Sequence, residues 1–487
     1  MKNYIYLIAV ALLMVGCSSE NEPSTLNPQP SALNYINLAI SVNGGVNSSS
    51  RAVPAGGEDG DGREAGFERE NNISGITLIL YEDAVGINSN DNPGIKFVAY
   101  YPVSRVTKDA DTRIEATYET GNQLVPHNTL DFTKTYHAIV VANANLTSTI
   151  TTSSKLNDVR NLTLANIYSG DATKPANSCG GFVMSSEQDN TLNFAASGVR
   201  TQDAAGDYYY DLSSQILVIE RMAARIDFWA KNSNGYKTSA ENAAYTIPGY
   251  EYNVTGSTDK FVVTGIVPFN IVNGHATYGN EYIIKRIRTD ISDAETTSYL
   301  ADETTTNYVM DPQTTAKTGS DGLTSSLESV YDLIGDGSKL ENTTYNPYFH
   351  SIESMRVTNG MSTIETKENV VVAYPMENTL NTTSMLYYYA TGIAVVGYYY
   401  VNGTGTGTRY VYLGYLRHQG EADSYDIMPY TTPLETTATL GANPMRFGIV
   451  RNNIYRVWIG SIDQKGEMEL KIKVKKWDPY THDFIYM

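Results

Sequence analysis

The chain alternates short apolar runs with polar, turn-forming stretches. Within residues 34–44 every second residue is apolar, namely Ile36, Leu38, Ile40 and Val42. A strict period of two is typical of a β-strand that turns one face to a core and the other to water. We therefore predict a first strand over residues 34–44 with these side chains buried.

Similar runs predict further strands along the rest of the chain, and a short helix is expected from about Lys155. The final run, residues 468–477, alternates apolar residues with Lys and Glu, which indicates a strand with one solvent-exposed face. Strands and helices do not alternate in the way a parallel sheet requires. The other expected strands are 73–83, 94–103, 136–145, 215–220, 224–231, 261–272, 369–378, 385–401, 409–416 and 449–462.

The length of 487 residues exceeds what one hydrophobic core usually fills, about 250–300 residues. Together with the strand pattern, this predicts a mostly all-β protein of two tandem, mostly antiparallel β-sandwich domains. We place them at 34–220 and 221–487, with the junction in the stretch QILVIERMAAR.

The first 17 residues have the pattern of a cleaved export signal. Lys2 is followed by an apolar run from residue 5 to 15, shorter than the roughly 20 residues that span a bilayer. The run ends at Gly16 and Cys17, which resembles the lipobox of bacterial lipoproteins and implies that Cys17 is lipidated. The alternative is an ordinary signal peptide that contains Cys17. Residues 18–33 are polar and Pro-bearing, and we expect them to be a tether.

A loop rich in Gly, Ser, Pro and acidic residues, 45–72, follows the first strand. This composition argues against a packed core and predicts a solvated, protease-accessible segment. The loop carries Arg51, Arg63 and Arg69. Taken by themselves, these arginines are charged residues of a solvated linker.

Composition and spacing argue against several function classes. A net charge of -18 leaves no basic face for nucleic acid. The 6 histidines form no metal-binding pair, and the cysteines, Cys17 and Cys179, form no zinc cluster. The stretch GTGTGT lacks the dinucleotide-binding pattern and predicts a hairpin tip. The acidic stretch 58–64 lacks the register of a calcium loop. We therefore expect no cofactor, no metal and no enzyme activity.

Several segments taken together resemble the fimbrillin family of Bacteroidales bacteria, the shaft, anchor and tip subunits of type V pili. Their order and spacing extend over nearly the whole chain, and the resemblance implies Greek-key-like, transthyretin-like topology in both sandwiches. The segments are the signal ending at Cys17, the first strand with Arg51 before a Gly-rich loop, YHAIVVANAN, ERMAARIDF, VTGIVPFNI, YPMEN, FGIVRNNIYRVWIGSI and IKVKKW.

The resemblance implies a subunit that is displayed on the outer membrane through its lipid, cut by an arginine-specific protease and polymerised by donor-strand exchange. Arg51 fits the cut best, with Arg63 and Arg69 as alternates. The first strand, with Ile36, Leu38, Ile40 and Val42, would vacate a groove for a neighbour's terminal strand. The donor region implied is 467–487, including Tyr480, Phe484, Ile485 and Tyr486.

The implied partners are other copies of the chain, accessory fimbrial subunits, the protease, and host or bacterial surface ligands. A shaft subunit fits better than an anchor or a tip, because Arg51 is well placed and a terminal strand is present. A second class is a surface lipoprotein that binds glycans through Tyr-rich hairpins without polymerising. An enzyme ranks third, because no nucleophile, metal cluster or cofactor loop is evident in the sequence.

Overall fold

The fold is mostly β. In the computed structural model α1, Leu156–Arg160, is a short α-helix with Lys155 as its N-cap residue, close to the expected start. The structure describes residues 32–42, 63–65, 68–82, 91–106, 109–110, 113–114, 117–126, 129–164, 168–170, 179–186, 190–238, 247–269, 281–284, 350–352, 369–375, 391–418, 425–429, 449 and 451–478.

Two sheets are built mainly from the first half of the chain. Their strands are β1 (Asn34–Asn37), β2 (Ala39–Val42), β4 (Gly75–Tyr81), β5 (Ile95–Pro102), β6 (Ser104–Val106), β9 (Thr117–Glu119), β10 (Gln123–Val125), β11 (Thr135–Ala142), β15 (Met184–Ser186), β16 (Asn190–Asn193), β17 (Arg200–Gln202), β18 (Tyr208–Asp211) and β19 (Leu217–Arg221). The larger sheet has the order β5-β4-β11-β15-β19-β2-β9-β6, and β16 also pairs with β11. The smaller sheet has the order β10-β1-β18-β17.

Two further sheets come mainly from the second half. Their strands are β3 (Arg63–Ala65), β20 (Arg225–Trp229), β21 (Tyr236–Lys237), β22 (Gly249–Asn253), β23 (Lys260–Phe269), β25 (His350–Ser351), β26 (Asn369–Ala373), β27 (Gly392–Tyr400), β28 (Thr408–His418), β29 (Tyr425–Pro429), β30 (Asn453–Ile462) and β31 (Met468–Asp478). One sheet has the order β26-β20-β30-β31-β3. The other has the order β21-β22-β23-β27-β28-β29, with β25 beside β23.

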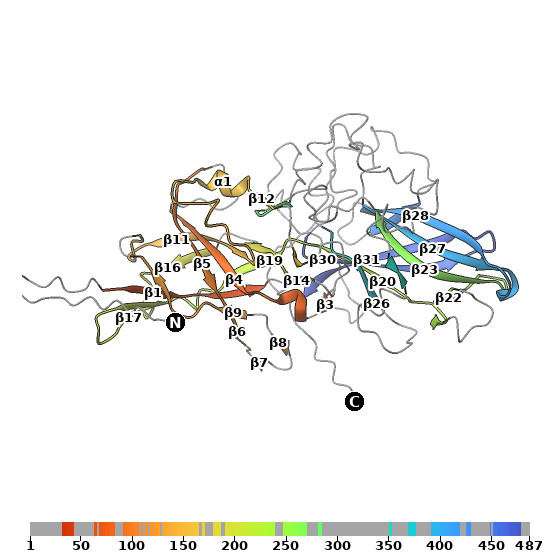
Figure 1. Ribbon diagram of the computed structural model, residues 1–487, viewed down its shortest axis with the longest axis horizontal. Helices are drawn as coiled ribbons and strands as arrows, with labels where there is room; N and C mark the ends of the chain where they lie inside the picture. The colour runs from red at the N-terminus through yellow and green to blue at the C-terminus, as the bar shows by residue number, and fades with distance from the viewer. Residues whose placement is uncertain are drawn as a thin grey trace, which may run out of the picture.

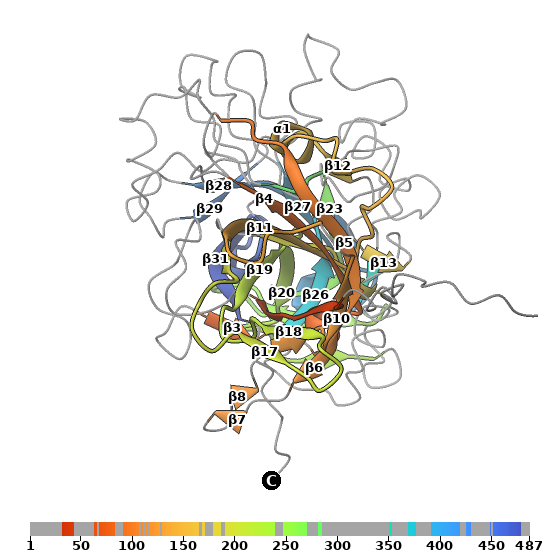
Figure 2. The same cartoon turned by 90° about the vertical axis from the view of Figure 1, so that its left-hand side faces the viewer.

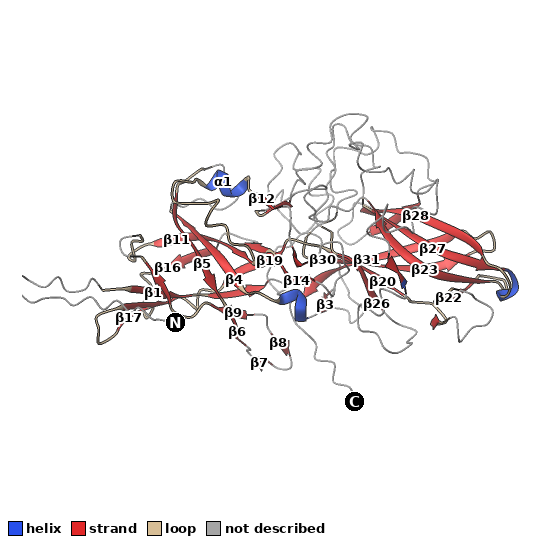
Figure 3. Cartoon of the chain, in the orientation of Figure 1, coloured by secondary structure: helices blue, strands red, loops and turns tan. Residues whose placement is uncertain are grey.

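The remaining strands form two-stranded pairs. These pairs are β7 (Asp109–Ala110) with β8 (Arg113–Ile114), β12 (Thr163–Leu164) with β24 (Glu281–Tyr282), and β13 (Tyr168–Gly170) with β14 (Cys179–Phe182). Two 3-10 turns are η1 (Glu68–Asn71) and η4 (Val401–Gly403). Figure 3 shows how few helical segments accompany the strands.

The two larger hydrophobic clusters of the described residues form a first core, mainly from β1 to β19, and a second core, mainly from β20 to β31. Figure 1 shows these two groups of strands one after the other along the long axis. The first core includes Met222 and Ala223, and the second core begins at Ala224. The first core also takes Val371 and Ile454 from later strands, so the two cores meet through shared strands. The domain limits at residue 220 stay a prediction.

The strand prediction is confirmed for the main runs, and the segment around GTGTGT forms the tip of the β27–β28 hairpin. Most pairs are antiparallel, as expected. Parallel pairs also occur: β1 with β18, β2 with β19, β20 with β30, and β3 with β31. The sequence pattern did not predict them, because a period of two is the same for both kinds of pairing.

Candidate functional site

The first strand belongs to two sheets. β1 lies in the smaller sheet and β2 in the larger, and the change of sheet takes place at Leu38. At this point the backbone N–H of Leu38 donates to Thr120 Oγ1 at 3.0 Å, and the N–H of Thr120 donates to the Leu38 carbonyl at 3.0 Å. These bonds satisfy the backbone groups that the change of sheet would otherwise leave buried without a partner.

In both sheets the first strand is an internal strand. β1 lies between β10, to which it is antiparallel, and β18, to which it is parallel. β2 lies between β9, again antiparallel, and β19, again parallel. We call the position of residues 34–42 between these four neighbours the slot. Removal of these residues would leave two facing rows of unpaired backbone groups in each sheet.

The inward face of the first strand is fully buried in the first core. The side chains of Ile36, Leu38 and Ile40 are 0% exposed and that of Val42 is 2% exposed. The burial expected from the sequence is thus confirmed, while the role of these side chains in an exchangeable slot stays a prediction. Ala39 is also 0% exposed, so the strand is covered on both faces near the change of sheet.

The outward face of β1 makes specific polar and aromatic contacts with β18. The rings of Tyr35 and Tyr209 are stacked, with centroids 4.9 Å apart and an interplanar angle of 9°. Asn37 Nδ2 donates to Asp211 Oδ1 at 3.1 Å. The pKa of Asp211 is lowered by hydrogen bonds from Ser213 and by the bond from Asn37. Burial acts in the opposite direction but does not outweigh them. The strand is therefore held by its outer side chains as well as by its core residues.

The loop after the first strand ends in two ordered pieces. β3 pairs in parallel with β31, so that Arg63 lies beside Lys476 and Ala65 beside Asp478. η1 follows, and its last residues, Glu70 and Asn71, are both 0% exposed. The expectation of a solvated loop is therefore wrong for these two residues, because each has partners in the interior.

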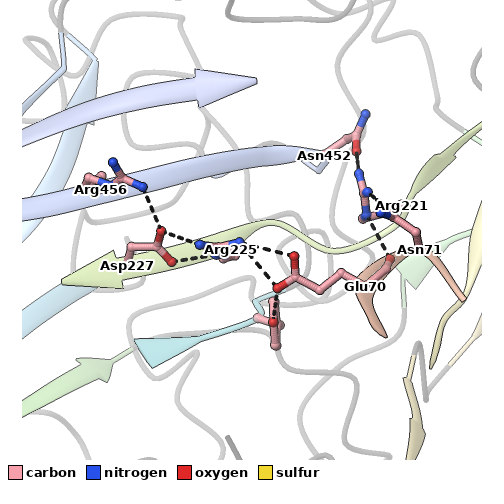
Figure 4. Close-up of polar contacts among 8 residues, drawn as sticks. Glu70, Asn71, Arg221, Arg225, Asp227, Asn452 and Arg456 are labelled. Carbon is pink, nitrogen blue, oxygen red and sulfur yellow. Dashed lines mark hydrogen bonds and ion pairs between the residues drawn. The ribbon is translucent and has the colours of Figure 1, made fainter. Parts of the chain in front are cut away.

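Glu70 belongs to a buried ionic chain that runs into the second core (Figure 4). Its Oε2 lies 3.2 Å from Arg225 Nη1, and Arg225 Nε donates to Asp227 Oδ1 at 2.7 Å. Asp227 Oδ2 in turn lies 3.6 Å from Arg456 Nη2. Burial lowers the pKa of Arg225, but the carboxylates of Asp227 and Glu70 outweigh this effect and raise the pKa above its ordinary value. Tyr374 also donates its hydroxyl to Glu70.

A second arginine joins the same segment to the start of β30. Arg221 Nε donates to the Glu70 carbonyl at 3.1 Å, and its Nη1 donates to Asn452 Oδ1 at 2.9 Å. Its Nη2 donates to the Asn71 side chain. Asn452 has the left-handed φ of 60° and donates its N–H to the Ala223 carbonyl at 2.8 Å. Through Arg221, residues 70 and 71 are thus linked both to the stretch that connects the two cores and to the residue that precedes β30.

The candidate site residues from the sequence do not gather in one place in the structure. The inward residues of the first strand occupy the slot, Arg63 lies in β3, and Arg69 lies in η1 directly before Glu70. Cys17, Arg51, Tyr480, Phe484, Ile485 and Tyr486 lie outside the described residues. β31 fills most of the donor region and belongs to the second core, where Ile472 is 8% and Val474 is 2% exposed. Cys179 begins β14.

Sequence reasoning missed the buried ionic chain. A signal for it was present, because Arg221, Arg225 and Asp227 stand in otherwise apolar strand segments, and a buried charge requires a partner. The identity of that partner, Glu70, was hidden in a segment whose composition is that of a solvated loop. Within the described ranges, His, Cys, Asp and Glu gather nowhere in a group that could hold a metal ion. None of the described helices has the length and apolar character to cross a membrane.

Comparison with known proteins gives structural neighbours only. No family model matches the sequence, and neither does any curated protein. A candidate cell adhesion protein from Parabacteroides distasonis is 12% identical, with 91% of this chain and 97% of that chain covered and a TM-score of 0.41. The tip fimbrial protein Mfa3 from Porphyromonas gingivalis, with a C-terminal truncation, is 11% identical over 91% of this chain and 100% of that chain, with a TM-score of 0.38.

A fimbrilin, FimA, from Porphyromonas gingivalis is 13% identical, with 91% of this chain and 98% of that chain covered and a TM-score of 0.30. The structural neighbours are thus cell adhesion candidates and fimbrilins of Bacteroidales, at low identity and low TM-score. Similarity at this level of identity and TM-score does not indicate a mechanism for this chain.

Proposed function

We propose that the chain is a structural subunit of a cell-surface fimbria, exported as a lipoprotein through Cys17, cut after Arg51 and polymerised by donor-strand exchange. The observation that carries the proposal is the position of the first strand. Residues 34–42 are internal to two sheets, they form the first strands that the structure describes, and residues 43–62 connect them to β3. One cut in that connection leaves them held by non-covalent contacts alone.

The energies involved favour replacement of the strand over simple loss. Burial of an apolar side chain is worth about 1.5–3 kcal/mol, so Ile36, Leu38, Ile40 and Val42 together contribute roughly 6–12 kcal/mol. A whole domain is stable by only about 5–15 kcal/mol. A subunit with an empty slot would therefore be close to unfolding, and a strand from another subunit would restore both the burial and the backbone hydrogen bonds.

The positions of Arg63 and Arg69 in the fold argue against these two residues and leave Arg51 as the proposed site of the cut. Proteases cut exposed segments that are not held in the fold. Arg63 is paired with β31, and Arg69 directly precedes the fully buried Glu70. A cut after Arg69 would also break the chain beside the Glu70–Arg225 ion pair. A cut after Arg51 releases the first strand and leaves both β3 and η1 attached to the second core.

The donor is proposed to be the segment 479–487 rather than β31. β31 pairs with β30 from Met468 to Lys476 and contributes to the second core, so its withdrawal would disrupt that core. Because the donor segment and the slot are different surfaces, the contact is head-to-tail and builds a filament. Its partners would be copies of the same chain and accessory fimbrial subunits, with the lipid on Cys17 anchoring the precursor to the outer membrane.

The test is limited digestion of residues 18–487 with an arginine-specific protease, followed by mass spectrometry and size-exclusion chromatography. We expect one early cut, after Arg51, and a series of oligomers. Arg51→Ala should abolish both, whereas Arg63→Ala and Arg69→Ala are matched controls that should change neither. A stable monomer that is cut but keeps its first strand would argue against a shaft subunit and favour an anchor, a tip, or a glycan-binding surface lipoprotein.

A further inference from the structure

The outward face of the small sheet carries a row of two tyrosines flanked by Leu124 and Thr201, and this sheet lies at the end of the described strands farthest from β28 (Figure 1). Leu124 of β10, Tyr35 of β1, Tyr209 of β18 and Thr201 of β17 are neighbours in register across this sheet. Figure 2, viewed from that end, shows β10, β18 and β17 toward the front. Leu124 is 49% exposed, and Leu33, just before β1, is 39% exposed.

This row is unusual because its central residue belongs to the strand that the proposed cut releases. Tyr35 is half-buried between Leu124 on one side and the stacked ring of Tyr209 on the other. Residues on the outward face of a strand do not fill the core, so Tyr35 contributes little to the burial that holds Ile36 and Leu38. Its contact with Tyr209 can instead distinguish one incoming strand from another.

Besides its stacking on Tyr35, Tyr209 has a side-chain hydrogen bond that does not involve β1. Its hydroxyl donates to Asp203 Oδ2 at 3.1 Å, and this bond is the main reason why the pKa of Tyr209 is raised. Asp203 is itself fixed, because its Oδ1 accepts hydrogen bonds from the N–H groups of Ala205 at 2.9 Å and Asp207 at 3.0 Å. This side-chain contact of Tyr209 lies within the β17–β18 hairpin, so it does not depend on the presence of β1.

We propose that Tyr209, with Leu124 on the opposite side of the slot, selects the strand that fills the slot by requiring an aromatic residue at the position of Tyr35. This inference rests on the proposed strand exchange and adds the chemistry of the partner. The incoming segment carries an aromatic residue followed, at the next residue and then at every second residue, by apolar side chains. A stacked aromatic pair contributes beyond the area it buries, and such a contact fixes register as well as affinity.

The same rule assigns a register to the donor segment of this chain. With Phe484 at the position of Tyr35, Ile485 takes the place of Ile36 and Met487 that of Leu38, so residues 484–487 fill the β1 part of the slot and not the positions of Ile40 and Val42. With Tyr480 there instead, Asp483 would take the place of Leu38, which is 0% exposed. A carboxylate without a partner is strongly disfavoured at such a position. Of Tyr480 and Phe484, Phe484 is thus the residue assigned to Tyr209.

The test uses the full chain, residues 18–487, cut after Arg51, and fluorescent peptides that replace the cut strand. The probe is the peptide of residues 32–43, and binding is followed by anisotropy. We expect Tyr35→Ala in the peptide to weaken binding by roughly two- to tenfold, and Tyr35→Phe to restore it. Ser41→Ala is the matched control, since Ser41 is also an outward residue, and it should bind like the unmodified peptide.

A double-mutant cycle separates stacking from a general loss of apolar area. In a Tyr209→Leu chain, the peptides with and without Tyr35→Ala should bind within about twofold of each other. If the Tyr209→Leu chain fails to fold, the binding of the Tyr35 peptide variants to the unmodified chain still tests whether an aromatic residue is required at position 35. The peptide of residues 478–487 should bind as well, and Phe484→Ala should weaken it by a similar factor.

The outcomes distinguish this inference from the proposed function. If the 32–43 peptide binds and Tyr35→Ala binds equally well, selection by Tyr209 is wrong and strand exchange stands. If no peptide enters the slot of the cut chain, strand exchange itself is wrong. If the 478–487 peptide binds without regard to Phe484, or does not bind, the register assigned to that segment is overturned.

Discussion

The carboxylate of Glu70 lies 3.2 Å from the guanidinium of Arg225, and their side chains are 0% and 2% exposed. Glu70 directly follows the arginine-bearing part of the loop, and Arg225 begins the strand that enters the second core. Through this pair, the segment that would become the N-terminal region of the cut chain is joined to the second core. The first strand can therefore leave while η1 stays fixed to that core.

Removal of one partner of this buried pair should be strongly destabilising. We expect Arg225→Leu to lower the free energy of unfolding by about 3–5 kcal/mol, because the buried carboxylates of Glu70 and Asp227 would lose the guanidinium between them. Urea unfolding followed by fluorescence measures the change. Lys471→Ala is the control, because Lys471 pairs with Glu469 at the surface, where such pairs contribute only about 0–1 kcal/mol. A decrease of less than about 1 kcal/mol in the free energy of unfolding for Arg225→Leu would show that the Glu70–Arg225 pair does not hold η1 to the second core.

The change of sheet at Leu38 should make this residue a sensitive point of the first strand. Leu38→Ala removes a side chain that is 0% exposed, and we expect a loss of about 2–5 kcal/mol in the free energy of unfolding. Ser41→Ala, on the outward face of the same strand, should stay within about 0.5 kcal/mol of the unmodified chain. Equal effects of the two substitutions would mean that the slot is not a core element.

The first strand should leave the cut chain faster in acid. Hydrogen bonds from Ser213 and Asn37 lower the pKa of Asp211 below its ordinary value of 3.8 in the folded chain. A carboxyl group with a lowered pKa contributes stability above the ordinary value, and this contribution is lost as the pH falls through the lowered pKa. We therefore expect the contact from Asn37 to Asp211 to weaken below about pH 4.

Dissociation of the cut strand between pH 3 and pH 6, followed by size-exclusion chromatography, measures this effect. Asp211→Asn removes the titrating group and should flatten the part of the pH dependence that belongs to it. An identical pH profile for the variant and the unmodified chain would assign the acid sensitivity to other carboxylates.

The sequence was most informative about the first strand, for a physical reason. The period-two pattern of Ile36, Leu38, Ile40 and Val42 continues unbroken through the change of sheet, because both halves turn the same face to one core. Because the pattern does not break at Leu38, it gave no sign that β1 and β2 belong to different sheets. The parallel neighbours, β18 and β19, lie more than 170 residues away in the sequence, and local patterning carries no information about such partners.

The candidate site was predictable only in part. The apolar residues of the slot follow from alternation, whereas Tyr209 belongs to a stretch, YYYD, that looks like any Tyr-rich strand. Its role depends on the register that places it beside Tyr35. Glu70 and Asn71 were misassigned to a solvated loop, because composition averages over a segment and two buried residues do not change that average.

The central claim is that the first strand must leave before the chain can polymerise, and a removable lock tests it most directly. Ser41 of β2 and Thr117 of β9 are register partners on antiparallel strands, a spacing that suits an engineered disulfide. In the Ser41→Cys, Thr117→Cys chain, residues 18–487, we expect the oxidised form to be cut after Arg51 yet to remain monomeric. Addition of reductant should then release the strand and produce oligomers. Oligomers of equal size from the locked, cut chain, or a reduced chain that loses its strand and stays monomeric, would contradict the account.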